Sequence, residues 1–239
     1  METVLIVGAT GNIGVSAVKA VLQTGRHVLA AVRNQASAEK LFHHVGTKDG
    51  ITTVEADVCS EKGVQGIVDL VRQGKLPAFQ HVYAAAGGGY SATPLQELST
   101  EDLRQIMTVN FESNLWAYRA TIPYLLAQND SRSTWTLCTG SQGDLGARAP
   151  PALTQGALYS MANVACRDNY KTNVRFNEIY LALRVEVDES AMKTGAMKAS
   201  EFAKCYAALL SDTGIRSSRV TVSGYDDLEK LKHESKVNL

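Results

Sequence analysis

The sequence has no excess of charge of either sign, because 24 Lys and Arg residues balance 24 Asp and Glu residues in a chain of 239. A balanced chain gives no electrostatic reason to expect nucleic acid or an anionic membrane surface as a partner, and we expect neither. No apolar run approaches the roughly 20 residues that a membrane helix needs, and no basic, apolar leader precedes the first predicted strand. We therefore expect a cytoplasmic protein.

Cysteine is also scarce, and its spacing excludes the usual cysteine-built sites. The four cysteines are Cys59, Cys138, Cys166 and Cys205, and they show no metal-ligand spacing. Their scatter over predicted strands and helices is typical of packed, reduced thiols and argues against a disulfide framework. We expect no metal site.

What the chain does contain is an alternation of short apolar runs and amphipathic stretches. We predict strands at 4–7, 27–32, 52–56, 80–85, 134–138, 174–183 and 219–222. We predict helices at 12–24, 37–44, 61–72, after the N-cap Ser99, and at 111–126, 157–169 and 199–210. Such alternation indicates parallel βαβ units. The predicted fold is a single α/β domain over 1–239: a Rossmann-like, doubly wound parallel sheet of about seven strands with helices on both faces. We expect a frayed polar tail at 230–239.

A glycine-rich turn joins the first predicted strand to the first predicted helix. It reads Gly8-Ala9-Thr10-Gly11-Asn12-Ile13-Gly14, in the strand–turn–helix context of a dinucleotide fingerprint. We expect Gly8 to allow the tight turn, Gly11 to let the backbone approach a pyrophosphate, and Gly14 to allow close helix–strand packing. The helix N-terminus then offers free N–H groups to the phosphate. We also expect Thr10, Asn12 and Ile13 to contact the cofactor.

The end of the second predicted strand indicates which dinucleotide is bound. A site for NAD carries Asp or Glu at this place to accept the ribose 2′-hydroxyl, whereas this chain carries Arg33. A guanidinium has no acceptor for a hydroxyl but suits a 2′-phosphate. The predicted cofactor is NADP(H), and Asn12 could add a further donor.

With these features, the order of later motifs resembles the short-chain dehydrogenase/reductase superfamily over nearly the whole chain. Asp57-Val58 stands where the family contacts adenine, and Ala85-Ala86-Gly87 resembles the family's stretch after strand four. Asn110 matches the family's structural asparagine in the long central helix. The resemblance implies that Ser141 and Tyr159 are the catalytic serine and tyrosine.

The chain departs from the family pattern one helical turn after the tyrosine. The family's Tyr-x-x-x-Lys reads Tyr159-Ser160-Met161-Ala162-Asn163, so the lysine is replaced by Asn163. Residues at i and i+4 share a helix face, and a cation there would lower the pKa of the phenol. Asn163 can bind a ribose hydroxyl but brings no charge. No other Lys or Arg stands one turn from Tyr159 in the helix.

The predicted activity is NADP(H)-dependent reduction of a carbonyl by hydride transfer. Tyr159 would donate the proton and Ser141 would polarise the carbonyl oxygen. The lost lysine keeps two alternatives open: a redox-neutral isomerase, dehydratase or cyclase on the same scaffold, and a non-enzymatic NADP(H) sensor. The partners expected are a small-molecule substrate and further copies of the chain, because helix 111–126 is apolar on too many sides to be exposed. The resemblance likewise implies a homodimer or homotetramer.

Overall fold

The computed structural model describes residues 1–237 and confirms the predicted α/β architecture. One eight-stranded sheet has the order β10-β9-β6-β5-β4-β1-β2-β3, and all its pairings are parallel except β10 with β9. Its strands are β1 (Thr3–Val7), β2 (His27–Val32), β3 (Ile51–Glu55), β4 (His81–Ala84), β5 (Thr134–Gly140), β6 (Arg175–Leu181), β9 (Ser218–Val222) and β10 (Lys232–Ser235). A separate short pair, β7 (Val185–Glu186) and β8 (Met197–Lys198), follows β6.

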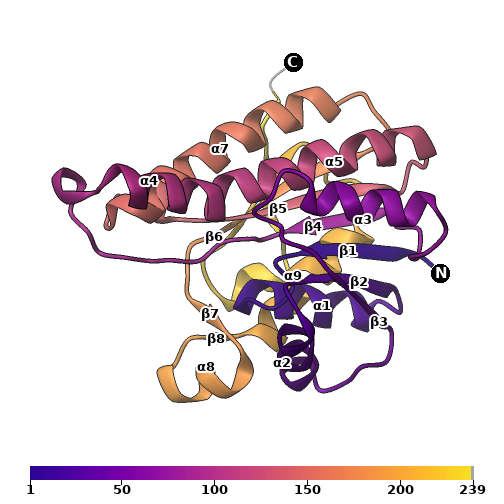
Figure 1. Cartoon of the computed structure of the whole chain (residues 1–239), viewed down its shortest axis with the longest axis horizontal. Helices are drawn as coiled ribbons and strands as arrows, with labels where there is room; N and C mark the ends of the chain where they lie inside the picture. Colours follow the sequence, from indigo (N-terminus) through magenta and orange to yellow (C-terminus); the bar gives the residue numbers. More distant parts are fainter. Residues whose placement is uncertain (238–239) are drawn as a thin grey trace.

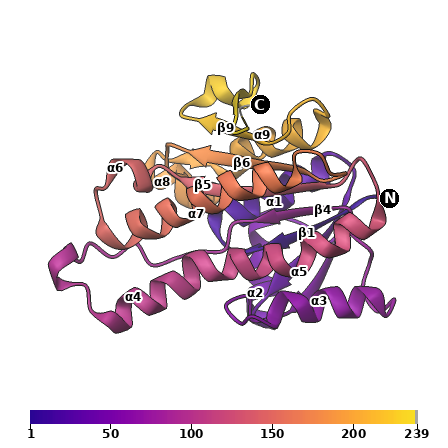
Figure 2. The same ribbon diagram turned by 90° about the horizontal axis from the view of Figure 1, so that it is seen from above.

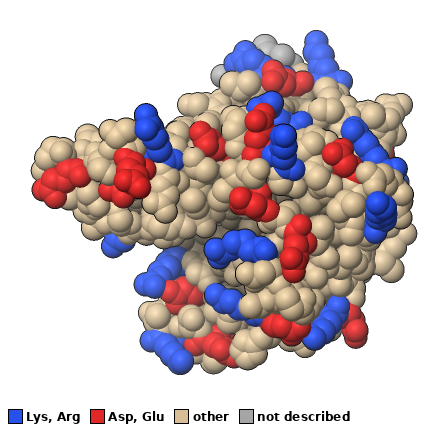
Figure 3. Space-filling view, viewed as in Figure 1, with Lys and Arg blue, Asp and Glu red and all other residues tan. Residues whose placement is uncertain are grey.

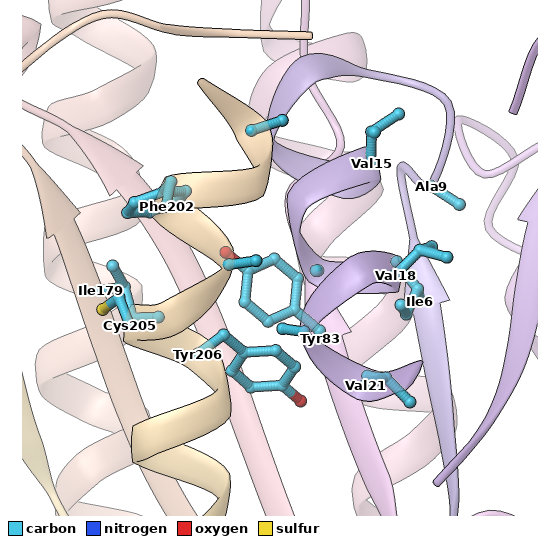
Figure 4. Close-up of a cluster of buried hydrophobic side chains, with 14 of the residues drawn as sticks. Ile6, Ala9, Val15, Val18, Val21, Tyr83, Ile179, Phe202, Cys205 and Tyr206 are labelled. Atoms are coloured by element: carbon cyan, nitrogen blue, oxygen red, sulfur yellow. The ribbon is translucent and has the colours of Figure 1, made fainter. Parts of the chain in front are cut away.

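Helices cover both faces of the sheet (Figures 1 and 2). One face packs against α1 (Asn12–Gln23), α2 (Gln35–Val45) and α9 (Ala199–Ser211). The other packs against α3 (Gly63–Arg72), α5 (Ser113–Gln128) and α7 (Ala149–Asn169). Figure 4 shows the first of these cores, where Tyr83 of β4 and Tyr206 of α9 lie together with their ring centroids 4.4 Å apart. Both faces of the central strands β1, β2 and β4 are therefore buried, which explains their nearly continuous apolar sequences.

The second half of the chain differs from the prediction mainly at helix boundaries. The helix capped by Ser99 is α4 (Thr100–Met107), and a π-helical turn at Thr108–Glu112 joins it to α5. Helix α7 begins eight residues earlier than predicted, with Pro150 and Pro151 in its first turn. The segment between β6 and α9 also holds the short helix α8 (Asp188–Thr194), and α6 (Gln142–Leu145) follows β5. The segment between β5 and β6 is thus mostly helical, whereas the predicted elements leave positions 139–156 outside any helix or strand.

The predicted frayed tail is wrong for the residues that the structure describes. Residues 232–235 form β10 and pair antiparallel with β9, Lys232 opposite Thr221 and Ser235 opposite Ser218. Lys236 donates its backbone N–H to the Ser217 carbonyl, and Val237 is buried. Backbone pairing, which needs no apolar pattern, holds this edge strand. Positions 238–239 of the tail lie outside the described residues.

Burial of His81 predicts a loss of stability in mild acid. His81 begins β4 and is 1% exposed, with Nδ1 3.0 Å from the Thr134 hydroxyl, and burial lowers the pKa of its imidazole to about 4. The unfolded chain, with an ordinary histidine pKa, then binds the proton more readily than the folded chain as pH falls. We expect the free energy of unfolding to drop by about 2 kcal/mol between about pH 7 and pH 5.

Urea unfolding at the two pH values measures this difference. The variant His81→Gln keeps a polar side chain but cannot titrate, so its unfolding free energy should change less over the same interval. If wild type and His81→Gln lose equal stability between the two pH values, His81 does not cause the acid sensitivity.

Candidate functional site

The strand order reverses between β1 and β4, and the carboxyl ends of these strands frame a crevice where α/β proteins bind ligands. Gly8 follows β1 with φ of +88°, and a Cβ there would lie 2.7 Å from the Ala85 carbonyl oxygen after β4. A Cβ on Gly14 would lie 2.1 Å from the Gly8 carbonyl oxygen. Both glycines are therefore required sterically, and Gly14 allows the close packing that the sequence predicts.

The crevice opens into a cleft of about 710 Å³, and Figure 3 shows the molecule hollowed beneath the projecting region around α4. Nine of the predicted cofactor residues line it: Gly8, Thr10, Gly11, Arg33, Asp57, Val58, Ala85, Ala86 and Gly87. Helix α1 starts at this cleft with Gly11 as N-cap and with no acidic residue in its first turn. The cradle thus offers glycine backbone and a helix N-terminus without a competing carboxylate, which fits the pyrophosphate of a dinucleotide.

The end of the cleft formed by β2 and β3 carries basic side chains. Arg33 follows β2, and Lys40, which the sequence analysis did not identify, extends from α2 to line the same cleft. Asp57 accepts a hydrogen bond from the Cys59 backbone N–H at 3.0 Å, so its carboxylate is already engaged locally. No local pattern in the sequence identifies Lys40, because Arg33 precedes α2 and no helical repeat relates the two residues.

The remaining three predicted cofactor residues do not line the cleft among the described residues. The Asn12 side-chain oxygen accepts a hydrogen bond from the Val187 backbone N–H at 3.2 Å, which ties the glycine turn to the start of α8. Ile13 packs against the apolar core, and Gly14 lies beneath the turn. The side chains of Asn12 and Ile13 therefore have structural partners, and a contact with cofactor from this turn would come from backbone.

Asn110 sits in the π-helical turn and connects the chain after β4 with α7. Its side-chain oxygen accepts the Gly88 N–H at 2.9 Å, and its amide donates to the Thr154 hydroxyl at 3.3 Å. Asn110 and Thr154 are both buried. Asn110 thus fixes the Ala85–Gly88 wall of the cleft relative to the N-terminal half of α7, a positioning role consistent with the structural asparagine that the resemblance implies.

Tyr159 contacts the turn after β5, and Ser141 belongs to this turn. The Tyr159 hydroxyl donates to the Gly140 carbonyl at 2.5 Å, and the Gly140 N–H donates to the Gln155 side-chain oxygen at 2.7 Å. Gly140 immediately precedes Ser141, so the structure brings the predicted serine and tyrosine to one turn. Neither side chain lines the cleft in the described part of the chain, where Pro150 is the α7 residue at the wall.

The surroundings of Tyr159 include a cation that no pattern within α7 revealed. Arg219 of β9 lies over the ring, with its guanidinium carbon 4.7 Å from the Tyr159 ring centroid and 4.6 Å from that of Tyr180. Burial and the nearby Asp144 raise the pKa of the Tyr159 phenol well above its ordinary value, while Arg219 acts in the opposite direction. At neutral pH the phenol is therefore protonated and can donate.

Asn163, which replaces the family's lysine, contacts a lysine from another element. Lys236, just after β10, places its Nζ 2.5 Å from the Asn163 side-chain oxygen and 2.8 Å from Oε2 of Glu178. Glu178 is fully buried on β6. Cations therefore reach the Tyr159–Asn163 side of α7 from β9 and β10, although none stands one turn from Tyr159 in the helix itself.

Comparison with known proteins agrees with this arrangement. The family model for short chain dehydrogenases matches residues 2–188. The chain is a member of the short-chain dehydrogenase family. A relative from Pestalotiopsis fici named short-chain dehydrogenase/reductase iacG is 54% identical over 240 residues, which cover 98% of this chain and 96% of the relative. The chain therefore belongs to a family of oxidoreductases.

Solved structures of short-chain dehydrogenases share the fold at low sequence identity. A protein from Brucella melitensis described as a glucose/ribitol dehydrogenase of this family has a TM-score of 0.76 at 21% identity, over 92% of this chain and 94% of that chain. ElxO, solved with NADP bound, has a TM-score of 0.80 at 16% identity over 92% and 96%. No helix within residues 1–237 is long and apolar enough to cross a membrane.

Proposed function

We propose that this short-chain dehydrogenase uses NADP(H) and reduces a carbonyl group on a small molecule. The observation that carries the cofactor preference is the pair of cations, Arg33 and Lys40, at the β2 end of the cleft. A 2′-phosphate there would gain charge-assisted hydrogen bonds from both side chains, whereas a ribose hydroxyl would find no strong acceptor on either. The NADP bound to the structurally similar ElxO is consistent with this proposal.

In the proposed reaction the cofactor supplies the hydride, and the chain's own residues manage the carbonyl oxygen. Tyr159 donates the proton and the Ser141 hydroxyl polarises the carbonyl, with Asn110 holding the wall of the cleft. Asn163 contacts Lys236 and does not line the cleft among the described residues, so we propose no contact between Asn163 and the cofactor ribose. For Tyr159 to act, its hydroxyl must exchange the Gly140 carbonyl for the substrate oxygen, which requires the turn after β5 to shift.

That same hydrogen bond favours a second candidate function. The Tyr159 hydroxyl is committed to a backbone carbonyl, and Pro150, which has no ionisable group, is the α7 residue lining the cleft among those described. With Tyr159 held at Gly140, the cleft suits a sensor that reports cofactor level to a partner. It also suits a redox-neutral isomerase, dehydratase or cyclase whose proton-transfer groups are other residues of the cleft.

Calorimetry and absorbance at 340 nm separate these functions. NADPH should bind more tightly than NADH, and a panel of aldehydes and ketones should then show consumption of NADPH in the reductase case. Tight NADPH binding with no consumption across the panel would support the redox-neutral enzyme or the sensor. Equal affinity for the two cofactors would contradict the NADP(H) proposal itself.

We also propose that the protein is a homodimer or homotetramer assembled through α5 and α7. These helices lie on the same outer face (Figure 2), and Val164 and Leu153 of α7 are 59% and 43% exposed. Covering exposed aliphatic side chains favours association. Light scattering at micromolar concentration should give at least twice the 25.7 kDa chain mass, and Val164→Lys should shift the mass toward the monomer. A wild-type monomer under these conditions would exclude the assembly.

A further inference from the structure

Lys236 belongs to the segment for which the sequence predicts a frayed end, yet its side chain is almost fully enclosed. Its ammonium group lies 2.8 Å from Glu178 Oε2, and the side chain is only 10% exposed. The same ammonium contacts the Asn163 side chain on α7. Pairing of β10 with β9 sets this position, because Ser235 lies opposite Ser218 immediately before Lys236.

Glu178, which lies near Tyr159, binds two cations. Arg219 donates to both carboxylate oxygens of Glu178, at 2.9 and 3.2 Å, and the Thr139 hydroxyl donates at 2.7 Å. One carboxylate cannot neutralise two cations, so with Lys236 in place the Arg219–Glu178–Lys236 group carries a net positive charge, which faces the carboxylate of Asp144. Without Lys236, Arg219 and Glu178 form a neutral pair, and the guanidinium over the Tyr159 ring is largely cancelled.

The network ends at the turn that carries the predicted serine. Arg219 packs over Tyr159, the Tyr159 hydroxyl holds the Gly140 carbonyl, and Ser141 follows. A Cβ on Gly143 would lie 2.5 Å from the Tyr159 ring, so the turn fits closely around the tyrosine. A change in the position of Arg219 would therefore be transmitted through Tyr159 to Ser141.

We propose that Lys236 is a positioning residue of the reductase site, which supplies from the C-terminal strand the cation that α7 lacks at position 163. Lys236 acts through Glu178 and Arg219, and it does not touch the reacting atoms. The C-terminal segment is thus part of the site. This inference rests on the proposed carbonyl reduction with Tyr159 as the proton donor.

Other charged and titratable groups also face the Tyr159 phenol, and their titration contributes to the dependence of kcat on pH. Tyr180 and Glu178 come from β6, Arg219 from β9 and Asp144 from α6, and the Tyr180 hydroxyl donates to Asp144 at 2.7 Å. On α7 itself, the buried Cys166 lies within the influence of Lys236 and Arg219. The variants of the test differ only in the cation at positions 163 and 236, since the other charged groups stay the same.

A charge exchange between positions 163 and 236 tests the proposal. The variants are Lys236→Met, Lys236→Arg, Asn163→Lys and the double variant Asn163→Lys with Lys236→Asn, each assayed for NADPH-dependent carbonyl reduction across pH. Lys236→Met should lower kcat by about tenfold or more with an unchanged KM for NADPH, because the cofactor cleft is untouched. Asn163→Lys alone crowds a third cation onto Glu178 and should also lose activity.

The double variant returns the cation to the helix, and Lys236→Arg keeps it on the strand. Both should recover kcat to within about threefold of wild type and restore the pH profile that Lys236→Met shifts. Lys230→Met is the matched control, because Lys230 is an exposed lysine of the same tail outside the network, and it should leave kcat unchanged.

The outcomes separate this inference from the proposed function. Wild type that consumes NADPH while Lys236→Met keeps full kcat overturns the positioning role and leaves carbonyl reduction standing. The positioning role is also overturned if the losses of kcat in the two single variants simply multiply in the double variant. It is overturned again if the loss of kcat in Lys236→Met accompanies a lowered urea midpoint and Lys236→Arg rescues neither. Wild type that consumes no NADPH with any carbonyl overturns the proposed function and this inference together.

Discussion

Tyr159→Phe should lower kcat for NADPH-dependent carbonyl reduction by about 10²–10⁴-fold, the usual effect of removing a positioned general acid. The phenol suits donation in this direction because burial and Asp144 raise its pKa, so it is neutral and carries its proton at pH 7. Its weakness as an acid is moderated by Arg219 over the ring. NADPH affinity should not change, since Tyr159 lies outside the cleft-lining residues described.

Tyr124→Phe provides the matched control for this experiment. Tyr124 lies on α5 against Phe79, with ring centroids 4.6 Å apart, and has no place in the proposed site. Its loss of one hydroxyl should leave kcat near that of wild type. If Tyr159→Phe keeps full activity, the proton comes from another group or from solvent, and the Tyr159–Gly140 hydrogen bond has only a structural role.

The parts of the site that could be predicted from the sequence are those whose residues are neighbours in the sequence. The turn from Gly8 to Gly14 and Arg33 after β2 depend on local order, because a strand, a tight turn and a helix follow one another directly. The doubly wound fold follows from the alternation of apolar runs and amphipathic helices. Of the catalytic predictions, the structure brings Ser141 and Tyr159 to one turn, and their roles stay predictions.

Features built from distant segments could not be predicted in this way. Arg219 and Lys236 reach the Tyr159 side of α7 only because β9 and β10 extend the sheet beyond β6, and strand order is not written in local pattern. Lys-His-Glu-Ser of β10 is exposed along its whole length, so it lacks the alternation by which strands are identified. Edge strands with charged side chains are common for this reason.

The sequence holds a signal for the early start of α7, although the predicted helix begins only at position 157. Pro150 and Pro151 occupy the first turn of the helix, where a missing N–H costs nothing and the fixed φ favours helix initiation. The consequence concerns function, because this first turn is what lines the cleft through Pro150, and Tyr159 lies more than two turns further along.

Arg33→Ala should weaken NADPH binding by about 1.5–3 kcal/mol, which is about 10- to 150-fold in the dissociation constant, and should leave NADH affinity nearly unchanged. The lost interaction is a charge-assisted hydrogen bond to the 2′-phosphate, a group that NADH does not have. Lys40 lines the same end of the cleft and should retain part of the preference, so the double variant with Lys40→Ala should bring the two affinities together. Isothermal titration calorimetry measures the NADPH and NADH affinities of wild type, of Arg33→Ala and of the double variant.

Arg33→Asp extends this test from loss of preference to its reversal. A carboxylate after β2 accepts the ribose 2′-hydroxyl and repels a 2′-phosphate, so this variant should bind NADH more tightly than NADPH. Arg72→Asp at the end of α3 makes the same change of two charges at an exposed arginine away from the cleft, and it controls for net charge. If Arg33→Ala weakens both cofactors equally, Arg33 contacts a group common to them, such as the pyrophosphate, and the preference for NADP(H) must come from elsewhere in the cleft.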